Sequence, residues 1–91
     1  MAPPQILYLS RADVEAARVP MQAIIERLEI AFGEKGRGNV EMPPKPGIHP
    51  GPPGSDNFIH AMPASVPALR AAGVKWVSGF PGNPNRGLPY V

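Results

Sequence analysis

Proline and glycine interrupt this chain so often that only short regular elements fit between them. The 91 residues include 14 prolines and 10 glycines, well above average usage. They are densest in residues 43–54, where the prolines lack the N–H donor that a β-ladder requires. We therefore expect an extended loop there. A domain of this size buries only about two thirds of the surface that its unfolded chain exposes, so its core should be thin.

The composition excludes several classes of function. Hydrophobic residues make up 43% and charged residues 18% of the chain, which is typical of a globular domain and not of a disordered segment. The formal net charge is +2, and the basic residues are scattered singly, so no surface for nucleic acid is predicted. The chain has no cysteine. Disulfides, thiolate metal sites and a cysteine nucleophile are therefore excluded, and no metal site is expected.

The amino terminus carries no sign of a targeting signal. It has no basic segment, and the apolar run Ile6–Leu9 is too short for a signal-peptide core or a membrane span. We expect a cytoplasmic protein that has no membrane partner.

Two helices are predicted in the first part of the chain. Residues 6–9 read as a strand, and Ser10 and Asp13 form a capping-box pattern that predicts a helix to about Arg18. A second helix should run from Pro20 to about Lys35. Its apolar face has the spacing of a single helical stripe, and glycines mark its end. The face comprises Met21, Ile24, Ile25, Leu28 and Phe32, and the glycines are Gly33, Gly36 and Gly38.

Short strands are predicted in the second part. Residues 40–42 and 74–77 read as strands, and so do residues 58–62, which should end at Pro63. Residues 67–72 read as a helical turn closed by Gly73. Because strands and helices do not alternate regularly, the prediction is an α+β fold. Two amino-terminal helices would pack on a small mixed sheet with long loops rich in proline and glycine.

Lys75 stands out because it lies within the apolar run Val74–Val77. Its ammonium group must be solvated, paired or bound to an anion, since burying it alone would cost several kcal/mol. Strand alternation places Lys75 on one face and Trp76 on the other. If Trp76 faces the core beneath the helices, Lys75 faces the opposite surface of the sheet. A solvated surface lysine and an anion-binding lysine both remain open at this point.

Three motifs, in this order and spacing, resemble the start of the ornithine cyclodeaminase/mu-crystallin family. They are Glu41–Lys45, His60–Ala64 and Gly73–Pro84, and the opening Tyr8–Val14 is similar too. The resemblance therefore spans nearly the whole chain. It implies NAD(P)-dependent chemistry on small amino or imino acids, by ornithine cyclodeaminases, alanine dehydrogenases or ketimine reductases. It also implies a homodimer, in which a domain for substrate binding and dimerisation accompanies a Rossmann domain.

The resemblance implies roles for individual residues. Lys75 matches the lysine that holds the substrate carboxylate in the family. Lys45 falls near the position of a second basic residue, often arginine, that also contacts this carboxylate. Two converging cations would neutralise and orient a carboxylate. His60 lies near the place where some cyclodeaminases have an active-site glutamate, which argues against strict ornithine specificity. It is a candidate pocket residue. Tyr90 lies near the place of a threonine that approaches the nucleotide.

The dinucleotide fingerprint of a Rossmann domain does not occur in these residues. Neither do the later aspartate and arginine that the resemblance implies for catalysis and substrate binding. We therefore interpret residues 1–91 as the amino-terminal part of the substrate-binding domain. We expect this part alone to be inactive and to bind neither NAD nor NADP. The alternative is a stand-alone module that binds carboxylates or dimerises without catalysis.

Overall fold

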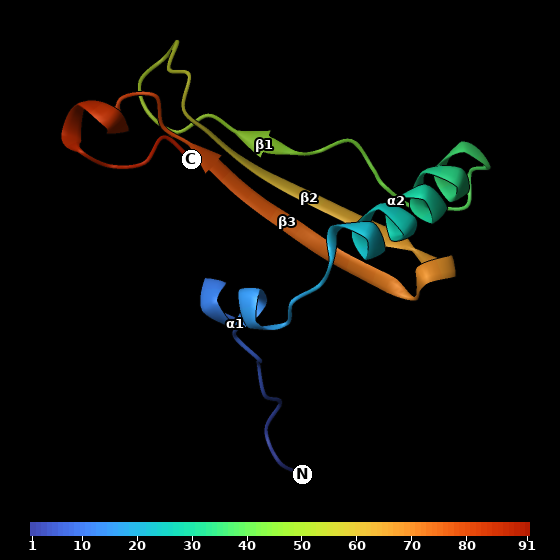
Figure 1. The fold of residues 1–91 in the computed structure, drawn as a ribbon. Helices are drawn as coiled ribbons and strands as arrows, with labels where there is room; N and C mark the ends of the chain where they lie inside the picture. Colours follow the sequence, from blue (N-terminus) through green and yellow to red (C-terminus); the bar gives the residue numbers. More distant parts are fainter.

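The computed structural model describes residues 1–91 as an α+β chain built around one long β-hairpin (Figure 1). Two helices precede the hairpin and a two-residue strand flanks it. The helices and strands are α1 (Arg11–Ala16), α2 (Met21–Gly36), β1 (Gly47–Ile48), β2 (Phe58–Val66) and β3 (Ala71–Gly79). Two 3-10 turns complete the fold, at Pro67–Leu69 and Asn83–Arg86. Neither helix is both long enough and apolar enough to cross a membrane.

Both predicted helices are present, with small shifts at their ends. The capping box forms, because the Ser10 hydroxyl accepts from the Asp13 amide and the Asp13 carboxylate accepts from the Ser10 amide. This helix ends before Arg18, which has a left-handed φ of 48°. Pro20 precedes α2 as its cap with extended backbone angles, and the helix continues through Gly33 to Gly36.

The hairpin is longer than the sequence predicts. Its strands pair antiparallel from Phe58 opposite Gly79 to Val66 opposite Ala71. The predicted helical turn over residues 67–72 is present but shorter, because a 3-10 turn forms only over Pro67–Leu69 and Arg70 closes it with a left-handed φ of 51°. Gly73 consequently lies within β3 and does not end a helix.

Pro63 does not end β2, contrary to the prediction. The amides of Ala61 and Ser65 donate to the carbonyls of Pro46 and Glu41, on the side away from β3. By strand alternation the nitrogen of Pro63 faces the same side. No hydrogen bond to β3 is therefore lost at this position, and the strand passes through the proline.

The loop predicted over residues 43–54 contains the third strand of the sheet. Gly47 and Ile48 pair with His60 and Ile59, which makes the strand order β1-β2-β3. All pairs are antiparallel, so the predicted mixed sheet is wrong. Residues 40–42 form no strand, since only Glu41 makes an isolated bridge, to Ser65. The many prolines restrict the pairing of this segment to two residues.

The first sixteen residues stand away from the sheet (Figure 1). The predicted strand at residues 6–9 is absent, and its side chains are 57% to 96% exposed. Every residue of α1 is exposed as well, so the prediction that both helices pack on the sheet is wrong for α1. A strand needs a neighbouring edge to satisfy its backbone groups, and no strand of the sheet lies beside residues 6–9.

The chain has no hydrophobic core of its own. Only one residue of the 91 is buried, and it is a glycine, Gly79. The accessible surface is 7959 Å², whereas a globular protein of this mass exposes about 5100 Å². The radius of gyration is 17.4 Å, against about 12 Å for a globular domain of this length. The apolar side chains of α2 are 40% to 69% exposed, namely Met21, Ile24, Ile25, Leu28 and Phe32.

We expect the isolated chain to unfold readily or to associate, because burial of apolar surface is the main favourable term in folding. Sedimentation velocity combined with urea unfolding at several protein concentrations tests this. The unfolding midpoint should rise with concentration. Cooperative unfolding of a monomer at a midpoint independent of concentration would contradict the prediction.

Acidification should weaken the start of α1. The Ser10 amide and hydroxyl donate to the Asp13 carboxylate at 2.8 and 2.9 Å, and these bonds hold the pKa of Asp13 below its ordinary value. Because the folded-state pKa is lowered, the stabilisation is present above the unfolded-state pKa and is lost as pH falls through the folded-state pKa. An NMR titration should place the Asp13 midpoint lower than in Ser10→Ala, which keeps only the backbone donor. Equal midpoints would count against this.

Candidate functional site

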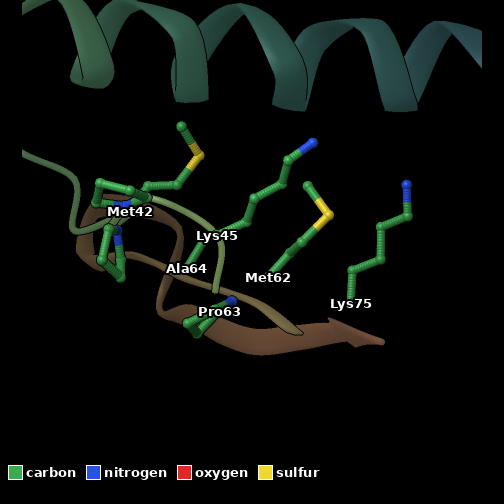
Figure 2. A pocket seen from close by; sticks show the side chains of 8 residues that line it. Met42, Lys45, Met62, Pro63, Ala64 and Lys75 are labelled. Carbon is green, nitrogen blue, oxygen red and sulfur yellow. The ribbon is translucent and has the colours of Figure 1, made fainter. Parts of the chain in front are cut away.

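Lys45 and Lys75 lie beside one hollow on the surface of the hairpin. Its volume is about 420 Å³. In Figure 2 the two lysine side chains run in the same direction, and the Met62 side chain lies between them. The lining residues are Met42, Pro43, Pro44, Lys45, Met62, Pro63, Ala64 and Lys75. The structure thus brings together the two lysines that the sequence predicted as carboxylate ligands.

The hairpin register positions Lys75. It pairs with Met62, and partners in an antiparallel ladder have side chains on the same face. In Figure 2 both side chains point to the side on which α2 lies. The assumption that Trp76 faces the helices is therefore wrong, and Lys75 lies on the α2 side instead. Trp76 occupies the opposite face and is 70% exposed, because nothing in the chain covers that face.

Lys45 is positioned by the prolines around it. Pro44 and Pro46 fix the backbone φ on either side of the lysine. The Pro46 carbonyl accepts a hydrogen bond of 3.2 Å from the Ala61 amide of β2, and Gly47 pairs with His60 just beyond. These contacts hold the segment against the hairpin, so Lys45 reaches the same hollow as Lys75.

No carboxylate lines the hollow. Glu41 pairs with Ser65, which belongs to the opposite face of β2, and Glu34 forms a 2.8 Å ion pair with Arg37. Hydrogen bonds from Arg37 and then Asn39 hold the pKa of Glu34 below its ordinary value. Lys35 adds a further cation at the rim, with Nζ 4.0 Å from Met42 Sδ. The hollow therefore combines positive charge with apolar walls, a combination that suits an organic anion.

His60 lies near the hollow but does not line it. It shares the face of Met62 on β2, and its ring stacks on Phe58 at a centroid distance of 4.6 Å and an interplanar angle of 27°. The ring also covers Gly47, where an added Cβ would contact the imidazole. The structure thus gives His60 a packing role, and a role in substrate binding stays a prediction.

Sequence reasoning missed the two methionines that form the apolar walls, Met42 and Met62. Both lie within the motifs that contain or flank the predicted residues. The signal that could have identified Met62 is its place in a strand next to the Lys75 strand. That signal required the strand register, which was not predicted.

The described residues do not form a site for a metal or a dinucleotide. No cluster of three or more histidine, aspartate or glutamate side chains is present. The sheet is antiparallel, and no strand leads through a glycine turn into an α-helix, which a dinucleotide-binding unit requires. Tyr90 lies at the far end of the hairpin, where its carbonyl accepts from the Phe80 amide at 2.8 Å. A second hollow of about 400 Å³ lies beside it, lined by Asn57, Phe80, Gly82, Asn83, Asn85 and Arg86, and the nucleotide contact implied for Tyr90 stays a prediction.

Comparisons with known proteins extend these observations. The profile of the ornithine cyclodeaminase/mu-crystallin family matches residues 5–91. The nodulation efficiency protein NfeD of Rhizobium meliloti is 38% identical over 86 residues, which cover 94% of this chain and 26% of that protein. The alanine dehydrogenase of Archaeoglobus fulgidus is 34% identical over 87 residues, 96% of this chain and 25% of that enzyme.

A solved structure has the same fold over this length. It is the Δ1-pyrroline-2-carboxylate reductase of Thermococcus litoralis, in complex with NADH and L-proline. The TM-score is 0.76 at 35% identity, over 93% of this chain and 25% of the reductase. The chain thus spans about a quarter of the length of the relatives that it matches.

Gly47 should be required for the packing of His60. In Gly47→Ala the new methyl group would meet the imidazole ring, and such overpacking typically costs about 1–3 kcal/mol. The imidazole signals of His60 in an NMR spectrum should shift, and the chain should unfold at lower urea. Gly73→Ala in β3 is the matched control, since no atom lies within 4 Å of its Cβ position. Equal effects of the two substitutions would contradict this assignment.

Proposed function

The chain belongs to the ornithine cyclodeaminase/mu-crystallin family, and we propose that it supplies part of the substrate site of an NAD(P)-dependent enzyme. The substrate would be a small amino or imino acid. Residues 1–91 would form the amino-terminal part of the domain for substrate binding and dimerisation. The observation that carries this proposal is the convergence of Lys45 and Lys75 on one hollow.

The chemistry of the hollow supports a carboxylate ligand. Each lysine offers three N–H donors and no acceptor. Hydrogen bonds between an ammonium and a carboxylate are about twice as strong as neutral ones. Because both lysines are exposed and no acidic side chain lines the hollow, their donors are open to a ligand. The Thermococcus litoralis reductase binds L-proline, which carries such a carboxylate.

The cofactor would be held by residues other than these. The Thermococcus litoralis reductase binds NADH. In a dehydrogenase or reductase, a nicotinamide cofactor would accept or donate the hydride. The 91 residues would orient the substrate carboxylate for that transfer and, alone, would neither bind NAD(P) nor catalyse. The exposed apolar faces of α2 and of β3 are consistent with burial against further parts of such an enzyme, including a second copy in a homodimer.

A carboxylate-binding module without catalysis is the second candidate. It is favoured by the fact that both lysines of the pair lie within the 91 residues. The two candidates differ in what happens when the nucleotide-binding part is supplied. An enzyme segment should then support turnover, whereas a binding module should bind carboxylates and support none.

A chimera tests the proposal. Residues 5–91 replace the homologous quarter of the Thermococcus litoralis reductase, and NADH-dependent reduction of Δ1-pyrroline-2-carboxylate is measured. We expect activity that falls at least roughly a hundredfold in Lys75→Gln and at least roughly tenfold in Lys45→Gln, since charged hydrogen bonds contribute about 1.5–3 kcal/mol each. The loss should appear as a higher KM.

Arg27→Gln is the matched control, because it removes one positive charge from an exposed position of α2 outside the hollow. It should leave kcat and KM unchanged. A folded chimera that binds NADH but reduces no substrate would favour the module without catalysis. Equal losses in Arg27→Gln and Lys75→Gln would show that the hollow does not hold the carboxylate.

A further inference from the structure

We propose that His60 is a positioning residue for Lys45. The ring of His60, stacked on Phe58, would hold β1 against the hairpin and would thereby hold this lysine at the hollow beside Lys75. The role rests on the carboxylate site proposed above, because it places one of the two lysines of that site. It goes beyond that site because His60 would act without touching the substrate.

The two rings connect all three strands of the sheet. Phe58 and His60 lie on one face of β2 and stack at a centroid distance of 4.6 Å. The Phe58 ring lies against Gly79 of β3, and the His60 ring lies against Gly47 of β1. Of the ten glycines in the chain, only these two have an aromatic ring at the position of the missing Cβ. Each glycine therefore provides the space that one ring occupies.

The hairpin fixes the Phe58 end of this ring pair. Phe58 and Gly79 are direct partners in the register, and Gly79 is the one buried residue of the chain. The hairpin pairs over nine residues of each strand, so the position of Phe58 does not depend on β1. The His60 ring can therefore transmit the position of the hairpin to β1.

The ladder that holds β1 is short. Gly47 and Ile48 pair with β2, and the Pro46 carbonyl accepts a hydrogen bond of 3.2 Å from the Ala61 amide. The prolines before β1 have no N–H group to extend this ladder. The contact between the His60 ring and Gly47 is therefore needed to fix the strand, and its loss should loosen β1.

A shift of Gly47 would reach Lys45, because only Pro46 separates the two residues. The rings of Pro44 and Pro46 fix the backbone φ on either side of the lysine, which leaves fewer rotations to absorb a shift. Lys75 belongs to β3 and keeps its place through the hairpin register. Loosening of β1 should therefore move Lys45 relative to Lys75.

A direct contact of His60 with the substrate is the alternative, and it requires a different property of the side chain. A residue that binds the substrate or transfers a proton uses its ring nitrogens. A residue that stacks on Phe58 and covers Gly47 needs only a flat aromatic ring. His60→Phe keeps the ring without the nitrogens, whereas His60→Ala removes both. The two variants therefore separate the two roles.

The chimera with the Thermococcus litoralis reductase tests the role through its kinetics. His60→Ala should raise KM at least about threefold and change kcat less than about twofold, because it weakens a binding contact. His60→Phe should keep KM within about twofold of the unmodified chimera. Val66→Ala, which truncates β2 at the end away from the rings, is the matched control and should leave KM unchanged. A folded His60→Phe chimera whose KM is as high as that of His60→Ala would overturn the proposal.

A double-mutant cycle shows whether His60 acts through Lys45. In Lys45→Gln, adding His60→Ala should lower kcat/KM less than about twofold further, because the lysine to be positioned is already lost. In Arg27→Gln, the same substitution should lower kcat/KM by at least about threefold. A residue that only stabilises the fold would have equal effects in both backgrounds, and this result would overturn the role.

Gly47→Ala provides a second variant that keeps the His60 ring in the chain. The new methyl group would meet this ring, so the substitution should lower kcat/KM in Arg27→Gln and leave it nearly unchanged in Lys45→Gln. Equal losses in these two backgrounds would contradict the role even where His60→Ala does not fold.

Hydrogen exchange gives a readout that does not depend on turnover. The Ala61 amide donates to Pro46, and the Ser65 amide donates to Glu41 on the same side of β2. Measured in the chimera by mass spectrometry, exchange at Ala61 should accelerate at least about tenfold in His60→Ala and remain slow in His60→Phe. Exchange at Ser65 should not change. Unchanged exchange at Ala61 in a folded His60→Ala chimera would overturn the role.

The proposed carboxylate site and the role of His60 fail in different ways. Turnover that depends on neither Lys45 nor Lys75 would overturn the site, and the role of His60 with it. Turnover that depends on both lysines, together with equal effects of His60→Ala in Lys45→Gln and Arg27→Gln, would overturn the role of His60 alone.

Discussion

The antiparallel pairing of β2 with β3 is the interaction on which the rest of this structure depends. It runs over nine residues of each strand and is the longer of the two strand pairings in the sheet. A shift of one residue would move every side chain of β3 to the other face. Lys75 would then leave the hollow and Trp76 would enter it. The register therefore decides the chemistry of the site as well as the fold.

The register also explains what could be predicted from the sequence and what could not. The helix α2 was predictable because its apolar spacing and its terminal glycines are local signals. The strand through Pro63 was not, because the tolerance of a proline depends on which side its nitrogen faces. That side is a property of the paired hairpin. Likewise Arg70, and not a glycine, takes the left-handed position at the turn, which no local rule predicts.

In the candidate site too, local sequence signals predicted some features, and others depended on contacts between distant segments. Alternation correctly separated Lys75 from Trp76, but it cannot say which face is covered, and the assumption that tryptophan faces the helices was wrong. The face is chosen by where α2 lies, which depends on contacts between distant segments. The pairing of Lys45 with Lys75 came from a family resemblance and not from spacing, since 29 residues lie between them. Met62 needed the register itself.

The exposed surface and the open site have a common physical origin. The helix α2, whose apolar side chains are exposed, lies on the Lys75 side of the hairpin. Trp76 and Val74 alternate with Lys75 along β3 and are exposed on the other side. A single covering element on either side would leave the opposite side in water. Two separate surfaces must therefore be buried if this chain is to gain a core, and a protein that buried only one would keep an exposed apolar patch. The hollow lies on the α2 side of the hairpin, where Lys45 and Lys75 are accessible to solvent. Covering that side would remove water from the lysines, and the lower local dielectric would strengthen their attraction for a carboxylate. Burial of the α2 side and completion of the anion site would then be one event, because the same surface supports both.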